Sequence, residues 1–575
     1  MTRRSRLGLL AIAGVALALR LVAIDRVPPD PFYDAAVRTM GGSAHAFLVG
    51  ALEPGARVAI DKPPVALWLQ VTSTKLLGFD RVSLQLPIVA AGVVAVVLLY
   101  DLVRRLAGPA SGLAAALVLA TAPIAVLTDR SDTMDSVMSA LLVLSAWLIV
   151  RAAETERTSL LWAAGVAAGL AFEVKLGEAL IAVPALAVLA VLAWPGPRRQ
   201  LLVAGAAFVL AALAWLVAIS LLPAPQRPYA LGSTNGSEWN IAVGYNGAGR
   251  LSSVKSLEGS LSHPGAMRLL DVKSQLGARL GVTLLTALTF GLLALASTDW
   301  RALRRNRTAV AAVAALAVWL LCGLVVFSAM QRLHARYLVQ LAAPAAAAVG
   351  VGAVALARAG TQRRWPALAC AVGTAAVAWF AATLVHDRAA LRVVVALAFA
   401  ALAFALALGV ARGHVAWPLL AGAALAAVLA FPVALSLDIV RTAQNDAGQA
   451  GQIAPAIQRR LSAYLIAHQG GARDEAAVEN PFTAAAVVVH DNRPILVLDN
   501  PSNRPLVPVA ALRAAVRNGQ VRYALLGPDC RELTHRGLPG CADSRWVRAH
   551  GVDVTAAAGL RPSAHHTALY RLSKR

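Results

Sequence analysis

Apolar runs long enough to cross a lipid bilayer recur along the first three quarters of this 575-residue chain. A helix needs about 20 residues to span the hydrocarbon core, and only a helix or a closed barrel pairs every backbone polar group there. The chain is therefore expected to be an all-α polytopic membrane protein. About thirteen spans are predicted, near residues 7–24, 84–103, 108–127, 137–152, 159–173, 178–194, 201–222, 278–296, 308–328, 338–357, 366–385, 390–411 and 415–436.

The composition agrees with this class. Apolar residues make up 58% of the chain and charged residues 14%, and the mean hydropathy is +0.65, whereas soluble globular proteins have roughly 25% charged residues. The formal net charge of +23 could indicate a nucleic-acid partner. However, the arginines lie in short clusters between apolar runs and form no basic domain with interleaved aromatic residues, so no nucleic-acid partner is expected.

The arginine clusters predict the topology. Basic residues favour the cytoplasmic side of a membrane, and they precede the first span and recur in every second loop: residues 3–6, 104–105, 151–157, 198–199, 301–307, 358–364 and 412. The N-terminus is thus expected in the cytoplasm, and the first span is expected to be a retained helix. The outer segments are then residues 25–83, 128–136, 174–177, 223–277, 329–337 and 437–575.

The C-terminal segment, residues 437–575, differs in composition from the rest of the chain. It is polar and contains no run long enough to span a bilayer. Two predicted strands, 494–499 and 521–526, flank a predicted amphipathic helix at 507–516, which indicates a small extracytoplasmic α/β domain. Cys530 and Cys541 lie in it and form either a disulfide or two free thiols, since disulfides persist in that compartment. Residues 1–436 are the predicted transmembrane domain.

Ionisable residues gather in the predicted outer segments and at the outer ends of the spans. Such groups are costly at membrane depth and are functional candidates by default, although a loop salt bridge or a snorkelling lysine is the simpler explanation for any one of them. The candidates are Asp30, Asp34, Asp61, Lys62, the cluster 128–136, and Lys175 with Glu173 and Glu178.

The motifs around these residues resemble one family. They are Y-x-A-A-V-x-x-M (33–40), D-K-P-P-x-x-L-W-x-Q (61–70), R-S-x-x-x-D (130–135), a lysine at 175, G-S-T-N-G-S (232–237), G-Y-N-G-x-G-R (244–250) and H-x-R-Y-L (334–338). Together they are similar to membrane glycosyltransferases of the GT-C fold related to aminoarabinose transferases and protein O-mannosyltransferases. The closest resemblance is to a bacterial subgroup of predicted mannosyltransferases. The D-K-P-P and G-Y-N-G-x-G-R motifs are its most specific part.

The resemblance implies a reaction. Members take a sugar from a polyprenyl-phosphate carrier, here mannose or an aminoarabinose-like pentose. They transfer it with inversion to an extracytoplasmic acceptor, which is a cell-envelope glycan, a lipid or a protein. The few lysines among the basic residues are typical of a GC-rich bacterial genome, so a bacterial plasma membrane is the expected location. An acidic residue of the first outer loop acts as general base, and the candidates are Asp30 or Asp34, with Asp61 in reserve.

The resemblance also implies binding residues. Lys62, Arg130 and Lys175 match positions that hold the phosphate or its carboxylate network, Asp135 matches the second outer acid, and His334 and Tyr337 match a late turn that shapes the donor site. The subgroup often has Asn and Ala where Asp30 and Asp34 stand. Asp132 and Asp135 could hold a divalent cation, and relatives both with and without a metal requirement exist, so no cofactor is assigned.

Two other classes remain as alternatives. A secondary transporter is also polytopic and contains buried ionisable residues, but no internal repeat is visible and the charges lie in outer loops. A catalytically inactive scaffold that displays the C-terminal segment is the other alternative. Release of sugar from a polyprenyl-phosphate sugar distinguishes the enzyme from both.

The arginine pattern generates the first testable prediction. A reporter fused after Arg575 should be active outside the cytoplasm, and the same reporter fused at Arg305 should be active inside. Paired alkaline phosphatase and fluorescent protein fusions measure this. The opposite result at either position would contradict the predicted span count.

Overall fold

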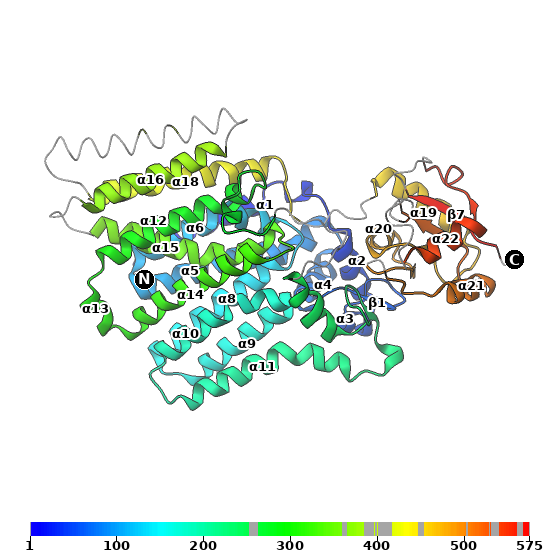
Figure 1. The fold of residues 1–575 in the computed structure, drawn as a ribbon, viewed down its shortest axis with the longest axis horizontal. Coiled ribbons are helices and arrows are strands. Elements are labelled where there is room, and N and C mark those ends of the chain that lie inside the picture. The colour runs from blue at the N-terminus through cyan, green and yellow to red at the C-terminus, as the bar shows by residue number, and fades with distance from the viewer. Residues whose placement is uncertain are drawn as a thin grey trace.

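A bundle of long helices forms most of the protein, and a smaller module lies at one end of it (Figure 1). The computed structural model describes residues 2–251, 263–358, 365–384, 396, 400, 417–446, 453–501, 504–527, 530, 540–560 and 567–573. The bundle helices are α1 (Arg3–Leu21), α5 (Arg81–Ala107), α6 (Pro109–Thr121), α7 (Pro123–Arg130), α8 (Asp135–Thr155), α9 (Thr158–Lys175), α10 (Val183–Ala193), α11 (Arg199–Ser220), α12 (Val282–Ser297), α14 (Arg307–Ala329), α15 (Val339–Arg358), α16 (Trp365–Thr383) and α18 (Trp417–Arg441).

Twelve of the thirteen predicted spans coincide with helices of this bundle, and the predicted span at 390–411 lies outside the described residues. In the described part of the chain, nine helices are long and apolar enough to cross a membrane, or ten if α6 and α7, which meet at 56°, form one span. Helix α10 and the C-terminal part of α16 are shorter apolar helices. The protein is therefore a multi-pass membrane protein, while the number thirteen stays a prediction.

Small residues allow the bundle helices to approach closely. A Cβ atom on Gly165 of α9 would lie 2.2 Å from the carbonyl oxygen of Ala204 in α11, and one on Gly352 of α15 would lie 2.1 Å from that of Phe290 in α12. Lipid tails supply no hydrophobic driving force for helix association, so close van der Waals packing has to replace it. The abundant alanine and glycine of the chain serve this packing.

A buried ion pair ties the first helix to the bundle. The Arg20 guanidinium Nε donates to Asp129 Oδ2 at 2.7 Å, and its Nη1 donates to the carbonyl oxygens of Ala16 and Ala120. Both charged side chains are almost fully buried. Gly92 of α5 leaves the space for the carboxylate, because a Cβ there would lie 2.2 Å from Asp129 Oδ2.

The two long segments predicted to lie outside, residues 25–83 and 223–277, fold over one end of the bundle in their described parts and meet in a small sheet. Strand β1 (Val58–Ala59) pairs in parallel with β2 (Tyr229–Ala230), with Val58 opposite Tyr229. Parallel strands require a long crossover, and here the crossover runs through helices α4 to α11. The short elements of this layer are α2 (Pro31–Met40), α3 (Ala44–Val49), α4 (Val65–Leu77), and the single helical turns η1 (Ile24–Arg26), η3 (Ala224–Gln226), η4 (Asn240–Tyr245), η5 (Ala248–Arg250), η6 (Arg268–Leu270) and η7 (Gly277–Gly281). At the opposite end of the bundle lies α13 (Trp300–Arg305) (Figure 1).

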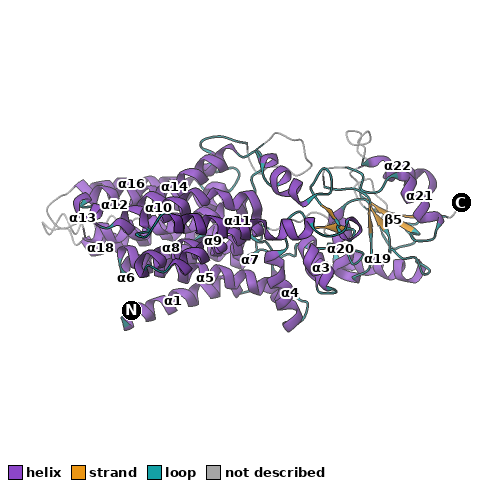
Figure 2. Cartoon of the chain, turned by 90° about the horizontal axis from the view of Figure 1, so that it is seen from below, coloured by secondary structure: helices purple, strands orange, loops and turns teal. Residues whose placement is uncertain are grey.

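The C-terminal module, residues 453–573, has an α/β fold around a five-stranded sheet (Figure 2). The strand order is β4-β3-β5-β7-β6, in which β3 is parallel to β4 and β5, and β7 is antiparallel to β5 and β6. Its elements are α19 (Pro455–His468), β3 (Ala477–Val478), α20 (Pro481–Asp491), β4 (Leu496–Val497), α21 (Val509–Arg517), β5 (Tyr523–Leu526), α22 (Cys541–His550), β6 (Val552–Asp553) and β7 (Ala568–Arg571).

The predicted elements of this module are confirmed as β4, α21 and β5. A disulfide joins Cys530 to Cys541, which decides between the two alternatives that the sequence left open. The sequence did not predict strand β3, which lies between β4 and β5, because it is two residues long in an alanine-rich stretch without the alternation that marks a strand.

The packing of Asp129 against α5 generates a stability prediction. We expect Gly92→Ala to lower the thermal stability of the purified protein, because the added methyl group must displace the carboxylate from Arg20. Overpacking of this kind costs about 1–3 kcal/mol. Gly14→Ala in α1 is the matched control, since a Cβ there meets nothing within 4 Å. Equal melting temperatures for both variants in detergent would contradict the close contact.

Candidate functional site

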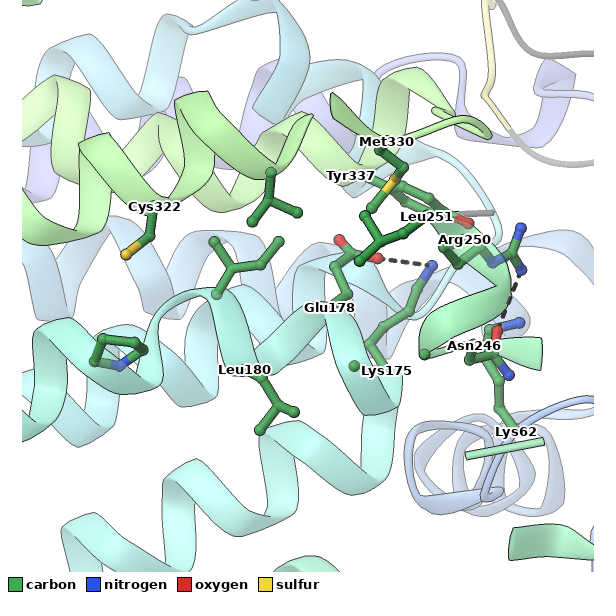
Figure 3. A pocket seen from close by; sticks show the side chains of 15 residues that line it. Lys62, Lys175, Glu178, Leu180, Asn246, Arg250, Leu251, Cys322, Met330 and Tyr337 are labelled. Atoms are coloured by element: carbon green, nitrogen blue, oxygen red, sulfur yellow. Dashed lines mark hydrogen bonds and ion pairs between the residues drawn. The ribbon is translucent and has the colours of Figure 1, made fainter. Parts of the chain in front are cut away.

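A cavity of about 320 Å³ lies at the end of the bundle that the predicted outer segments cover, between α9, α10, α14 and the described part of residues 223–277 (Figure 3). Its lining divides into two groups. The polar group is Lys62, Lys175, Glu178, Asn246, Arg250 and Tyr337, and the apolar group includes Leu180, Ile181, Pro184, Cys322 and Val326. The labelled side chains in Figure 3 show Lys62, Asn246 and Arg250 at one end of the cavity and Cys322 at the other.

The D-K-P-P stretch brings Asp61 and Lys62 to the polar end. Strand β1 leads directly into this pair, and the two prolines after it lack the backbone N–H of a ladder or helix, so α4 begins only at Val65. Lys62 Nζ lies 2.6 Å from Asp61 Oδ2 and donates to the Tyr33 hydroxyl oxygen at 3.0 Å. The predicted acidic and basic pair therefore exists, and Tyr33 of α2 is its third member.

Burial and neighbouring charges together lower the pKa values of both members of this pair. The shift favours the charged form of Asp61 and the neutral form of Lys62. Burial lowers the pKa of Lys62 to about 8, helped by the nearby cations of Lys175 and Arg250 and opposed by Asp61. Burial alone would raise the pKa of Asp61, but the attraction and hydrogen bond of Lys62, together with the charges of Arg250 and Lys175, lower the pKa. At neutral pH the pair is thus a carboxylate beside an ammonium group that loses its proton only a little higher on the pH scale.

Lys175 is the centre of a second charged cluster. Helix α9 ends at this residue, and a 3₁₀ helix, η2 (Leu176–Ile181), follows. Lys175 Nζ lies 3.0 Å from Asp135 Oδ1, 3.7 Å from Glu178 Oε2 and 4.6 Å from the centroid of the Tyr337 ring. The structure therefore brings three of the predicted site residues, Asp135, Lys175 and Tyr337, into one cluster.

The G-Y-N-G-x-G-R motif connects the second outer segment to the D-K-P-P stretch. Asn246 Nδ2 donates to the carbonyl oxygen of Asp61 at 2.7 Å, and Arg250 Nη2 donates to Asn246 Oδ1 at 3.2 Å. The Arg250 guanidinium also lies 4.9 Å from the centroid of the Tyr245 ring. Residues far apart in the sequence thus form one polar wall of the cavity.

Asp34 belongs to a separate buried network. Arg81 bridges two carboxylates, with Nη2 at 2.9 Å from Asp34 Oδ2 and Nη1 at 3.3 Å from Asp132 Oδ2, and Gln70 Nε2 donates to Asp132 Oδ1 at 2.7 Å. Burial and the adjacent Asp132 raise the pKa of Asp34 well above its usual range, although Arg81 opposes the shift. The side chain of Asp34 is therefore held by Arg81, which limits its freedom to accept a proton from an acceptor hydroxyl.

Asp132 and Asp135, the predicted candidates for a divalent cation, have different cationic partners. Asp132 contacts Arg81, and Asp135 contacts Lys175. In the part of the chain that the structure describes, no group of three or more His, Cys, Asp or Glu side chains is arranged to hold a metal ion. Each of the two acids thus forms an ion pair with a protein cation.

Asp30 and His334 lie beside the clusters. Asp30 is the N-cap of α2, where its Oδ1 accepts a hydrogen bond from the backbone N–H of Phe32 at 3.1 Å, and its side chain is buried. The ring of His334 packs edge-on against Tyr337, with 5.2 Å between centroids. His334 therefore adjoins the Lys175 cluster through Tyr337, and Asp30 precedes Tyr33, which contacts Lys62, by three residues at the start of α2.

Arg130 lies away from the cavity lining. It is fully buried, and it donates to backbone carbonyl oxygens at the C-terminal end of α1, those of Leu19, Arg20 and Ala23. The carbonyl groups of Leu19 and Arg20 belong to the last turn of α1, where a helix end leaves such groups unpaired. In this position the guanidinium caps α1.

Four residues of the site were not singled out from the sequence: Tyr33, Arg81, Asn246 and Arg250. Three of them lie inside quoted motifs, so the signal was present but carried no assigned role. Arg81 lies three residues before the predicted span 84–103, where an arginine is usually explained by snorkelling to the membrane surface. Its partners, Asp34 and Asp132, come from other segments and become visible only in three dimensions.

This fold, a helical bundle with an outer-end cavity and a C-terminal α/β module, is the GT-C fold of membrane glycosyltransferases. ArnT from Cupriavidus metallidurans in the apo state matches over 98% of each chain, with a TM-score of 0.56 at 16% sequence identity. The same protein bound to undecaprenyl phosphate matches with a TM-score of 0.53 at 18% identity, over 98% of this chain and 97% of the other. The archaeal oligosaccharyltransferase AglB from Archaeoglobus fulgidus matches over 96% of this chain and 73% of its own, with a TM-score of 0.52 at 12% identity.

Sequence comparisons give the more specific relatives. Residues 61–223 match the family model described as dolichyl-phosphate-mannose-protein mannosyltransferase. Two Bacillus subtilis proteins, "Putative mannosyltransferase YycA" and "Putative mannosyltransferase YkcB", are 33% and 32% identical over 226 and 231 residues, which is 39% and 40% of this chain. The matched part of the chain spans about a third of the length of these relatives, 33% and 32%. The resemblance inferred from the motifs is confirmed by these matches.

The lowered pKa of Lys62 generates a pH prediction. Lys62 is charged below about pH 8 and loses its proton as the pH rises through that value, so the affinity of the cavity for an alkyl phosphate should fall between about pH 7 and about pH 9. Binding of the anion restores the charge, and calorimetry in two buffers should therefore register proton uptake above about pH 8.

Lys62→Arg is the matched control for this measurement. Arginine stays charged over the whole range, so its affinity profile should be flat where that of the wild type falls. A wild-type affinity that does not change up to about pH 9 would contradict the assignment of Lys62 to anion binding.

Proposed function

We propose that this protein is a membrane glycosyltransferase that takes its sugar from a polyprenyl-phosphate carrier. The observation that carries the proposal is the two-part lining of the cavity, polar and cationic at one end and apolar at the other. A polyprenyl phosphate has the same two parts, an anionic head and a hydrocarbon chain. The shared fold with ArnT, which has been solved bound to undecaprenyl phosphate, supports the same ligand class.

The carrier phosphate is assigned to the polar end. Lys62 and Arg250 are cations that line it, and Tyr337 offers a hydroxyl group. Lys175 faces two carboxylates, Asp135 and Glu178, so it serves to orient this wall as well as to attract the anion. Preorganised donors around a leaving phosphate stabilise the charge that develops on it as its bond to the sugar breaks.

The hydrocarbon chain is assigned to the apolar end. Leu180, Ile181 and Pro184, at the junction of η2 and α10, face Cys322 and Val326 of α14 across the cavity. Burial of hydrocarbon against such a surface contributes roughly 25 cal/mol per Å² of apolar area. A donor held at both ends presents its anomeric carbon near the charged pair Asp61 and Lys62.

Asp30 is the first candidate for the general base. In the proposed reaction the carboxylate takes the proton of the acceptor hydroxyl while that oxygen attacks the anomeric carbon, and the carbon–oxygen bond to the carrier phosphate breaks. Asp34 is the second candidate, but Arg81 and Asp132 engage it. Asp61 is the third, and its contact with Lys62 fits a role in orienting that cation.

The remaining parts of the proposal follow the family resemblance. The sugar is mannose or an aminoarabinose-like pentose, and the acceptor is a cell-envelope glycan, a lipid or a protein. Residues 1–436 form the catalytic transmembrane domain of a bacterial plasma membrane enzyme. The N-terminus lies in the cytoplasm, and residues 437–575 form an extracytoplasmic domain. His334 is assigned to the donor site through its contact with Tyr337.

The test of the mechanism is Asp30→Asn. Asn is as good an N-cap as Asp, so α2 should keep its cap while the base is lost. We expect transfer from a polyprenyl-phosphate sugar, or its slow hydrolysis without acceptor, to fall by about 10²- to 10⁴-fold, with donor binding retained. Purified protein and a radiolabelled donor measure both quantities.

Asp80→Asn is the matched control for Asp30→Asn, because Asp80 is the N-cap of α5 and lies at the protein surface. It should leave turnover unchanged. If Asp30→Asn, Asp34→Asn and Asp61→Asn all retain near-normal transfer, the base-catalysed mechanism is wrong for this protein. If the wild type neither transfers nor hydrolyses any polyprenyl-phosphate sugar, a transporter becomes the better explanation.

A further inference from the structure

The C-terminal module contacts residues that flank the two strands of the small β1–β2 sheet. Arg57, directly before β1, forms a two-pronged ion pair with Asp474 of the module, in which Nη1 lies 3.0 Å from Asp474 Oδ2. Arg57 Nη2 also donates to the carbonyl oxygen of Ile495 at 2.9 Å. On the β2 side, Asn500 Nδ2 donates to the carbonyl oxygen of Ser233 at 3.1 Å. The module therefore contacts the chain just before β1 and just after β2.

The ion pair of Arg57 and Asp474 is largely buried. Asp474 is almost fully buried, and the Arg57 side chain is 30% exposed. Glu53 holds the same loop from the other side, accepting hydrogen bonds from the backbone N–H groups of Gly55 and Arg57. Two-pronged arginine–carboxylate contacts fix orientation as well as distance, so this pair sets the direction in which β1 starts.

The module also packs against α2, which carries Asp30 and Tyr33. Helices α2 and α20 lie against each other, with 5.4 Å between the ring centroids of Phe32 and Phe482, and Arg38 donates to the carbonyl oxygen of Val489. Figure 1 shows α20 beside α2 at the end of the bundle. Both outer elements that carry candidate catalytic groups thus rest on the same module.

Strand β1 connects Arg57 to the polar end of the cavity. The backbone N–H of Tyr229 donates to the carbonyl oxygen of Arg57 at 2.8 Å, and that of Leu231 donates to Ala59 at 3.0 Å. Four residues after Arg57 the chain reaches Asp61, whose carbonyl oxygen accepts from Asn246. The backbone between the ion pair and the cavity is therefore held by hydrogen bonds along its length.

We propose that Asp474 is a positioning residue of the site: by holding Arg57 it fixes β1 and, through β1, the placement of Asp61 and Lys62 in the cavity. A role in turnover rests on the proposed function, whereas the effect on the sheet does not. A misplacement of about 1 Å far from the reacting atoms can cost about 100-fold in rate, so a contact outside the cavity can control the reaction without touching the donor.

The test is Asp474→Asn in the full-length protein, followed by two readouts. Hydrogen exchange in detergent should accelerate severalfold at the amides that close the sheet and its loop, those of Leu52, Ile60, Tyr229 and Leu231, while the bundle helices remain protected. Turnover of the polyprenyl-phosphate sugar should fall by about 10- to 100-fold at a temperature where the variant stays folded. Asp474→Glu keeps the charge and should recover part of both.

Asp438→Asn is the matched control. It removes a carboxylate from an ion pair with Arg441 at 3.0 Å, and Arg441 is 78% exposed, so exchange in the β1–β2 sheet and turnover should both be unaffected. An unchanged exchange rate in Asp474→Asn would overturn the positioning proposal, whatever the turnover.

Faster exchange across the whole C-terminal module, equally in Asp474→Asn and Asp474→Glu, would also overturn it, because Asp474 would then serve the stability of the module. Absence of turnover in the wild type refutes the proposed function alone. The exchange comparison still decides the role of Asp474 in that case.

Discussion

Several buried cations at the cavity end of the bundle lie against carboxylates from other parts of the chain, because an uncompensated charge there costs several kcal/mol. Lys175 faces Asp135, and Arg20 faces Asp129. Arg81 joins two outer segments through its pair of acids. These contacts fix how the helix ends and outer segments approach one another, and the polar wall of the cavity is a product of that pairing.

The sequence predicted the bundle well because membrane crossing imposes one simple rule, a long apolar run for each helix. It also predicted which outer residues carry charge, and the contact of Asp61 with Lys62 follows from their adjacency. What it could not give was the pairing between distant segments. Arg130 resembled a phosphate ligand until its carbonyl partners on α1 were visible, and Asp34 resembled a free base until Arg81 was seen to hold it.

The small sheet and the docked module were beyond sequence reasoning for a related reason. Strands β1 and β2 are two residues long, so neither shows the alternation that identifies a strand. Their pairing depends on hydrogen bonds between segments on opposite sides of a long crossover, which no local pattern records. The contact between Arg57 and Asp474 likewise joins an early loop to the last domain of the chain, and a lone arginine in a polar loop carries no sign of its partner.

During synthesis, β1 emerges long before β2, and Asp474 emerges after both strands. Contacts between residues so distant in sequence form late, since the intervening chain must first be ordered. A nascent chain in the translocon would therefore hold the D-K-P-P stretch without the neighbours that orient it. If Asp474 positions the D-K-P-P stretch, the site is complete only after the C-terminal module has folded against the segment before β1. Incomplete chains, which ribosome stalling or proteolysis produces, would then not waste a lipid-linked sugar by hydrolysing it.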